Sequence, residues 1–272
     1  MIDKSQLLAE YDQHLRAEAE MAGALSVDRL GPLYLGIHGE EAEERTGFVS
    51  YARLAREPGG TADRALVDEA VKLLVAWRDA HPELTEVEIK TRSHDRAEGL
   101  AEALTAAGFE AEEPESVMLG PVDGLVDAPT PEGVIIAPAL TEEAMWAAAR
   151  MEDEVFGSSM AERIVPELLR RRAAGEAVAL WSAVADGRVV SAGRIEPVVG
   201  TQIAGIWGGA TLPEYRGRGI YRALTAARAT AARDQGIRFI HSDSTEDSRP
   251  ILERSGLFKV TETTPFVWRR EA

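Results

Sequence analysis

Residues 208–224, which read GGATLPEYRGRGIYRAL, combine the end of a strand, a glycine-rich turn and the start of a helix. The strand ends by Pro213, because proline has no amide hydrogen to donate to a neighbouring strand. Gly217 and Gly219 lack a Cβ, so backbone amides of the turn can point inward. The helix expected over Ile220–Gln235 starts with amides that have no partner within the helix, at the positive end of its dipole. The segment therefore predicts an anion-binding turn.

Three arginines surround this turn, Arg216, Arg218 and Arg222, so the expected anion is a phosphate or a diphosphate. Two common phosphate-binding motifs do not occur in the sequence. There is no Gly-Lys-Ser/Thr tripeptide of a P-loop, and Arg222 stands where a dinucleotide-binding GxGxxG motif needs its third glycine. A tight strand-to-helix turn whose arginines only face solvent is the alternative interpretation.

The elements expected around the turn follow a definite order. Thr141 is expected to cap a helix that starts at Glu142, and Asp186-Gly187 between two alternating segments predicts a β-hairpin. The expected elements are strand Gly133–Ala137, helices Glu142–Phe156 and Met160–Ala174, strands Val178–Ala185, Arg188–Glu196 and Gln202–Thr211, helix Ile220–Gln235 and strand Arg238–Ser242.

Residues 131–272 resemble a domain of the GNAT family of N-acetyltransferases in this order and in the turn itself. The family binds the diphosphate of coenzyme A through Arg/Gln-x-x-Gly-x-Gly/Ala, which stands here as Arg216 to Tyr221, with tyrosine in place of the usual small residue. The resemblance implies acetyl-coenzyme A as co-substrate. Its pantetheine arm would pair with the third strand, which splays from the strand after it. The implied contacts are Gly209, Ala210, Thr211, Arg216, Gly217, Arg218, Gly219, Ile220, Tyr221 and Ser248.

The same resemblance implies that an amine of a small-molecule substrate attacks the thioester directly and that an acid protonates the leaving thiolate. Many family members use a tyrosine of the last helix, and Leu252 stands at that position here. Tyr221, His241 and Ser244 are the candidates to replace it; otherwise the thiolate leaves unassisted or takes a proton from water. A coenzyme-binding module without catalysis is therefore the alternative function.

The attacking amine also needs a base. The third strand offers no carboxylate, so the candidates lie elsewhere: Glu152, Asp153 and Glu154 on a helix, Glu196 at a strand end, and His241. An unperturbed imidazole titrates near pH ~6.5, which suits a proton shuttle, although a strand histidine is commonly structural. Helix carboxylates commonly face solvent. The predicted catalytic set is His241, Glu154 and Tyr221.

The first half of the chain faintly repeats the second half. Each half has a long helix, a short strand and a helix that ends at a glycine before an extended stretch. In the first half these are Ala62–His81, Glu86–Thr91 and a helix ending at Gly108, which corresponds to Gly256. The first half lacks the coenzyme motif, and Asp63 lies where a phosphate would approach, so its carboxylate would repel the anion.

We therefore expect an α+β protein of two tandem acyl-CoA N-acyltransferase folds, each a mixed, mostly antiparallel sheet flanked by helices. The expected domains are a degenerate copy at residues 1–130 and an acetyl-coenzyme A-binding domain at residues 131–272. A proline-containing linker is expected over residues 121–138, with few core-forming residues until Val134, and it leads into the strand Gly133–Ala137.

Charge and cysteine content limit the remaining partners and the compartment. Residues 1–130 hold 12 Lys and Arg against 27 Asp and Glu, a net charge of −15, whereas the whole chain has −16. Such an acidic chain repels nucleic acid. No apolar run is long enough for a membrane span, no secretory signal or metal site is expected, and the absence of cysteine fits a reducing compartment, so we expect a cytoplasmic protein. The sequence leaves the oligomeric state open, a homodimer included.

Overall fold

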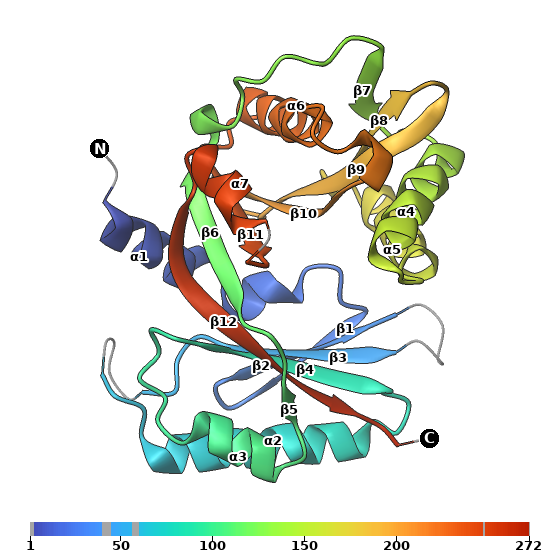
Figure 1. The fold of residues 1–272 in the computed structure, drawn as a ribbon. Coiled ribbons are helices and arrows are strands. Elements are labelled where there is room, and N and C mark those ends of the chain that lie inside the picture. The colour runs from blue at the N-terminus through green and yellow to red at the C-terminus, as the bar shows by residue number, and fades with distance from the viewer. Residues whose placement is uncertain (1–2, 40–44, 56–59, 247, 272) are drawn as a thin grey trace. The chain divides into compact units, whose positions relative to one another are not determined.

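The computed structural model describes residues 3–39, 45–55, 60–246 and 248–271. Contacts divide the chain into two compact units, each traced in Figure 1. The first unit comprises Met1–Val117, Ser244–Asp247 and Lys259–Ala272, and the second comprises Met118–Asp243 and Ser248–Phe258. The last strand thus belongs with the first unit, whereas the expected domain boundary follows residue 130. The division into two compact units does not show which segments fold independently. The domains at residues 1–130 and 131–272 therefore stay a prediction.

The strands of the first unit pair in the order β1-β2-β3-β4-β12, and β5 also pairs with β12. β3 and β4 are parallel, whereas the other recorded pairs are antiparallel. The elements are α1 (Lys4–His14), η1 (Ala17–Met21), β1 (Ser26–Leu30), β2 (Leu33–His38), β3 (Thr46–Tyr51), α2 (Arg64–Ala80), β4 (Glu86–Arg92), α3 (Leu100–Ala106), β5 (Glu110–Ala111) and β12 (Phe258–Arg269).

One face of α2 forms the core of the first unit. Its apolar residues recur at helical spacing and are buried against the strands, where Leu35, Val49 and Ile89 are also buried. Figure 1 shows α2 and α3 lying along one face of these strands. The buried positions of α2 are Val67, Ala70, Val71, Leu74 and Trp77.

The strands of the second unit follow the order β6-β11-β10-β9-β8-β7. β10 and β11 are parallel, and the pairs β10–β9, β9–β8 and β8–β7 are antiparallel. The elements are β6 (Glu115–Pro121), which starts in the first unit, η3 (Val122–Gly124), β7 (Val134–Pro138), α4 (Glu142–Phe156), α5 (Ala161–Ala173), β8 (Ala179–Ala185), β9 (Arg188–Pro197), β10 (Ile203–Thr211), η4 (Pro213–Tyr215), α6 (Ile220–Asp234), β11 (Phe239–Ser244) and α7 (Arg249–Arg254).

Local sequence signals set several of these bounds. α4 begins and ends at the predicted residues, and the Thr141 hydroxyl accepts a hydrogen bond from the Ala144 amide at 3.2 Å. The β8–β9 hairpin turns at Asp186 and Gly187, whose φ angles of +52° and +76° are both left-handed. These angles explain why the turn has Asp-Gly. Both predictions are confirmed.

The prediction of a linker over residues 121–138 is wrong for the first residues of that segment. Val122 and Leu125 are only 3% exposed and pack in the core of the second unit with Ile195 and Ile240. The prolines of the segment suggested a solvated connection, but the two apolar residues between them are spaced to face one side of the short η3 turn. The segment therefore contributes to the core that supports β10 and β11.

The expected fold class is confirmed: the protein is α+β, with mixed, mostly antiparallel strand pairing and flanking helices. Within the described residues, no helix combines the length and apolar character that crossing a membrane requires.

Candidate active site

A break in the pairing of β10 creates the framework of the candidate site. β10 pairs with β11 only over Ile203–Gly205, opposite Phe239–His241, although β10 continues to Thr211. The register of β10 against β9 also shifts between Trp207 and Ala210. This shift is a β-bulge, a feature that re-aims strand groups near functional sites. Among the described residues, the end of β10 therefore has no strand partner on the β11 side, which is the arrangement expected for the splayed strands.

The turn after β10 has the geometry predicted for an anion site. Gly217 and Gly219 have φ angles of +74° and +79°, which side chains with a Cβ rarely adopt. Gly219 is the N-cap of α6, and the Ala223 amide donates to its carbonyl at 3.0 Å. The amides of Ile220–Arg222 precede this bond and so have no acceptor within the helix. They lie at the positive end of a 15-residue helix, where a phosphate is stabilised.

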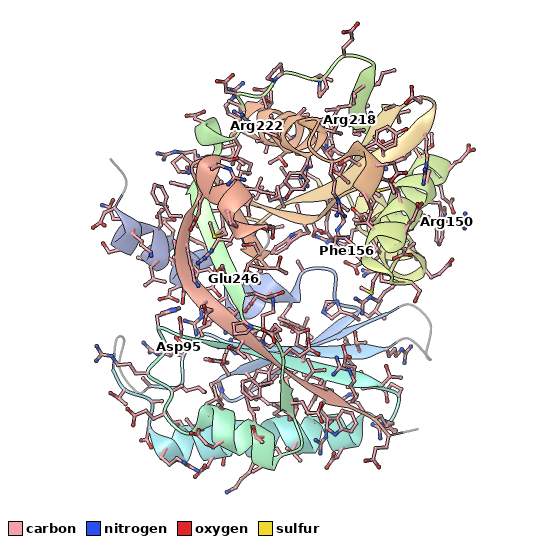
Figure 2. All side chains as sticks on the ribbon, in the orientation of Figure 1. Asp95, Arg150, Phe156, Arg218, Arg222 and Glu246 are labelled. Carbon is pink, nitrogen blue, oxygen red and sulfur yellow. The ribbon has the colours of Figure 1, made fainter. Side chains whose placement is uncertain are left out.

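The three arginines of the turn are each attached to a backbone carbonyl. Arg216 Nε donates to Thr211 at 3.0 Å, and Arg222 Nη2 donates to Asp127 at 3.0 Å. The Arg218 guanidinium donates to the Glu214 carbonyl at 3.1 Å and lies 4.9 Å from the centre of the Tyr215 ring. Figure 2 shows Arg218 and Arg222 beside α6. The arginines brace the turn while their positive charges stay at the N-terminus of the helix.

Tyr221 lies directly against the β10 bulge. A Cβ placed on Gly209 would stand 2.8 Å from Cε2 of Tyr221 and 2.9 Å from its hydroxyl. Such a contact is too short for a real side chain, so the ring occupies the space that only a glycine leaves. The hydroxyl of Tyr221 is therefore held at the strand predicted to pair with the pantetheine arm.

Glu152 of α4 lies against the preceding residue of the same bulge. A Cβ on Gly208 would be 3.0 Å from Oε1 of Glu152 and 3.2 Å from Oε2. The carboxylate is buried, with 5% of the residue exposed, and Oε2 lies 3.9 Å from Nη1 of Arg194 on β9. Within the described part of the chain, Oε1 has no hydrogen-bond partner. Its free lone pairs can accept a proton from a bound group.

The pKa of this carboxyl suits a base that works near neutral pH. Burial raises the pKa of Glu152 to about 7, although the positive charges of Arg194 and Arg228 act to lower it; Asp153 adds to the rise. A buried carboxyl with a perturbed pKa and an unused oxygen is a common property of proton-transfer residues.

The predicted base Glu154 lies on a different face of the same helix. Two residues are ~200° apart around an α-helix, so Glu154 points away when Glu152 is buried. Its carboxylate is exposed and accepts from Arg188 at 2.7 Å. Asp153 caps the next helix by accepting from the Met160 amide at 2.8 Å. The structure thus brings Glu152 to the bulge and places the other two carboxylates in surface and capping contacts.

The other predicted residues lie on β11, β9 and near α7. His241 is 8% exposed, and its ring lies edge-on to Trp207, 4.9 Å between centres. Glu196 pairs with Arg171 at 2.7 Å. Ser248 stands at the N-cap position of α7, and Leu252 is buried in the core. His241 therefore has an aromatic packing role, and Leu252 offers no proton donor.

Sequence reasoning missed Arg194 and Arg228. Arg228 is 1% exposed and occupies a core-facing position of α6, in register with Ile220 and Leu224 at spacings of four residues. A charged residue in an apolar helical stripe was the available signal. Among the described residues, no group of three or more His, Cys, Asp or Glu is arranged to hold a metal ion.

The first unit has a similar break in strand pairing, between β3 and β4. Side chains of the first unit occupy the opening between these two strand ends. β3 and β4 pair in parallel only as far as Val49 and Ile89, although β3 continues to Tyr51 and β4 to Arg92. Arg92 donates to the Tyr11 hydroxyl at 2.9 Å and to Glu20 at 2.6 Å.

The edge of β3 and the start of α2 are closed as well. The Ala17 amide donates to the Ser50 hydroxyl at 2.9 Å, so η1 covers the end of β3. The Asp63 carboxylate caps α2 and accepts from the Ala65 amide at 2.9 Å. An anion at this helix end would meet the carboxylate predicted to repel it.

Comparisons with known proteins agree with this architecture. The profile of the acetyltransferase (GNAT) family matches residues 141–256. The comparison with curated protein sequences found no match. Among solved structures, a GCN5-related N-acetyltransferase from Kribbella flavida is similar at 17% identity and a TM-score of 0.66, over 100% of this chain and 97% of that one.

Two further structures share the fold. A GCN5-related N-acetyltransferase from Sphaerobacter thermophilus is 18% identical over 89% of this chain and 78% of that one, with a TM-score of 0.61. A tandem GNAT protein from the clavulanic acid biosynthesis pathway is 15% identical over 98% and 96%, with a TM-score of 0.59. These identities show a common fold. The profile match by itself identifies residues 141–256 as a domain of the acetyltransferase (GNAT) family.

Proposed function

We propose that this protein is an N-acetyltransferase that transfers the acetyl group of acetyl-coenzyme A to an amine of a small-molecule substrate. One observation carries the proposal: Glu152 and Tyr221 contact the two adjacent glycines of the β10 bulge, Gly208 and Gly209. A buried carboxylate and a phenol thus lie against adjacent residues of the strand that leads into the predicted anion-binding turn. The family match supports acyl transfer in general.

The coenzyme would bind along β10 and the turn. The amides at the start of α6 and the arginine charges would hold the diphosphate, and the backbone of Gly209, Ala210 and Thr211 would pair with the pantetheine arm. Ser248 beside α7 would offer a hydroxyl to the same arm. These assignments follow the family motif residue by residue.

The chemistry divides between the two side chains at the bulge. The amine nitrogen attacks the thioester carbonyl carbon and loses a proton to the Glu152 carboxylate. The carbon–sulfur bond then breaks, and the thiolate takes a proton from the Tyr221 hydroxyl. A strand amide donates a hydrogen bond to the carbonyl oxygen while negative charge develops on it. The products are the acetamide and coenzyme A, and solvent restores both side chains to their starting protonation states.

This assignment replaces Glu154 by Glu152 as the proposed base and makes His241 a wall residue beside Trp207. It keeps Tyr221 as the proposed acid, in place of the tyrosine that many family members have at the position of Leu252. We also propose that residues 131–272 bind the coenzyme and catalyse the transfer, and that the first half is a degenerate copy that binds no coenzyme. The protein is proposed to act in the cytoplasm, whose reducing conditions suit a chain without cysteine.

Coenzyme binding is the first test. Acetyl-coenzyme A is expected to raise the melting temperature, and Gly219→Glu is expected to abolish the increase, because a carboxylate would stand at the phosphate position. Gly200→Glu is the matched control: Gly200 has a φ of +76° and open space around it, so the strain is the same but the position is a remote turn. Unchanged binding by Gly219→Glu would contradict the proposed site.

Turnover separates the enzyme from a coenzyme-binding module, the function that Leu252 would favour. Thiol release from acetyl-coenzyme A is measured against a broad panel of primary amines. Release with any amine supports transfer, provided that Glu152→Gln removes it while coenzyme binding persists. Tight binding without release across the panel would identify a binding module instead.

A further inference from the structure

Two buried polar atoms beside the β10 bulge lack hydrogen-bond partners. They are Nη1 of Arg194 and Oε1 of Glu152, and neither has a partner within the described part of the chain. Arg194 Nη1 lies 3.9 Å from Oε2 of the same carboxylate, a distance longer than a hydrogen bond. A donor and an acceptor held at such a separation leave room for a bridging group, either a water molecule or an atom of a ligand.

The rest of the Arg194 guanidinium is held in place. Nε donates to Glu196 at 3.3 Å, and Glu196 also accepts from Arg171 at 2.7 Å. The side chains of Arg194 and Glu152 are only 16% and 6% exposed, so neither is free to turn into solvent. Two carboxylates therefore already balance the charge of Arg194, while its Nη1 group still has hydrogens to donate.

An indole lies on the same face of the strands as this polar pair. Trp207 of β10 is directly opposite Arg194 of β9, and opposite residues of paired strands share a face. A Cβ on Gly205 would stand 2.6 Å from Nε1 of Trp207 and 2.7 Å from its Cε2, so the ring lies over the strand in space that only glycine leaves. His241 packs against it edge-on. The half-buried indole thus offers an apolar surface beside Arg194 and Glu152.

The chemistry of the gap selects a hydroxyl group. A hydroxyl can accept a hydrogen bond from Arg194 Nη1 and donate one to Glu152 Oε2, whereas a carbonyl has no hydrogen for the carboxylate. A ligand carboxylate or phosphate would meet the negative charges of Glu152 and Glu196. An amine on the carbon next to the hydroxyl-bearing carbon would reach the neighbouring oxygen, Oε1, because both oxygens belong to one carboxylate.

We propose that the acceptor substrate is a vicinal amino alcohol. Arg194 Nη1 and Glu152 Oε2 bind its hydroxyl group, Glu152 Oε1 receives its amine, and Trp207 packs against its carbon skeleton. Arg194 is then a specificity-determining residue, because it contacts the part of the substrate that does not react. The inference rests on the proposed function, since it takes Glu152 as the base of an amine acetylation.

The test compares amines that differ only by a hydroxyl or a methyl group: ethanolamine against propylamine, and trans-2-aminocyclohexanol against trans-2-methylcyclohexylamine. The ratio of kcat/KM within each pair is measured at one pH for the full-length protein and its variants. Arg194→Met is expected to lower this ratio on the order of 10–100-fold, the effect of losing a hydrogen bond from a charged group. Arg188→Met, at an exposed position of the same strand, leaves the ratio unchanged.

Comparing ratios between variants removes the different basicity of the two amines and any change in the strength of the base. If Arg194→Met does not fold, Arg194→Lys takes its place: it keeps a charge beside Glu196 but has only one nitrogen, so the ratio is expected to fall as well. A ratio that stays at the wild-type value in the folded variant would overturn the proposal. 2-Methoxyethylamine, which cannot donate to Oε2, is expected to lose the advantage of ethanolamine.

A binding measurement separates this inference from the proposed function. Each amine is titrated calorimetrically into the protein saturated with coenzyme A. Preferential binding of the amino alcohols that Arg194→Met removes, without transfer to any amine, would refute the proposed function and leave the hydroxyl site intact. Acetylation of both members of each pair, with the same ratio in the wild type and in Arg194→Met, would refute the hydroxyl site alone. Neither transfer nor preferential binding would refute both.

Discussion

At the scale of single residues, burial of the Glu152 carboxylate lowers the stability of the folded state at neutral pH, and the same burial gives the carboxyl the pKa that the proposed base needs. Its pKa of about 7 in the folded protein exceeds the ordinary value of 4.5, so the folded state retains a proton that the unfolded chain releases. The folded state is therefore penalised as the pH rises from 4.5 through about 7, and the penalty is complete above that range.

Glu152→Gln is expected to stabilise the protein above pH 7 and to abolish transfer. The gain in the free energy of unfolding at pH 8 is on the order of 1–3 kcal/mol and disappears near pH 4, where both states are protonated. Urea unfolding at the two pH values measures it. Glu154→Gln, an exposed position paired with Arg188, is the matched control, with little change in stability or activity. A greater loss of activity in Glu154→Gln than in Glu152→Gln would restore Glu154 as the base.

Buried charge also determines the behaviour of Arg92 in the first unit. Arg92→Met is expected to lower the free energy of unfolding by about 3–5 kcal/mol, because it leaves Glu20 without its buried partner. Arg64→Met is the control: its ion pair with Asp68 is exposed, so the expected loss is below about 1 kcal/mol. Equal losses in the two variants would show that the buried network contributes no more than a surface pair.

At the scale of elements, the β10 bulge depends on two glycines that leave room for side chains from helices. Gly209→Ala is expected to destabilise the protein by about 1–3 kcal/mol, because its Cβ would overlap the Tyr221 ring. In the Tyr221→Ala background the space is free, and the loss should shrink below about 1 kcal/mol. Unfolding in urea measures both losses. Identical losses in the two backgrounds would show that the ring does not occupy this space.

Local chemistry explains which elements can be predicted from the sequence. The Thr141 cap, the Asp186-Gly187 turn and the apolar stripe of α6 are signals within a few residues, and the structure follows them. Strand β1 has no comparable signal: it is exposed along nearly its whole length, so no alternation of apolar residues marks it. The burial of Val122 and Leu125 was not predicted, because the prolines near them in the sequence indicated a linker.

The candidate site divides in the same way. The turn itself follows from glycines and arginines that are adjacent in sequence, and Gly217 and Gly219 have the expected left-handed φ angles before α6. That the turn binds an anion stays a prediction. Helix periodicity places Glu152, rather than Glu154, on the buried stripe of α4 with Met145 and Ala148. The base still does not follow from the sequence, because the contacts of Glu152 with Gly208 and Arg194 come from strands distant in the sequence. Burial of charge is a tertiary property.

At the scale of the whole molecule, the two halves share a topology and differ in what occupies the strand opening. In the second unit, the end of β10 carries glycines and a bulge; in the first, Arg92, Tyr11 and Glu20 fill the corresponding region. The architecture of the first unit can persist with this region filled by internal hydrogen bonds, because its core of strands and α2 does not depend on the opening.

This difference predicts one acetyl-coenzyme A per chain in isothermal titration. The second unit offers free amides at α6, whereas the Asp63 carboxylate caps α2 and would repel a diphosphate at the other candidate position. Gly219→Glu should therefore reduce the stoichiometry from one to zero. Asp63→Asn should leave it at one, because removing the charge leaves the cap and the Arg92 network in place. Two sites in the wild type, or residual binding by Gly219→Glu, would mean that the first half still binds the coenzyme.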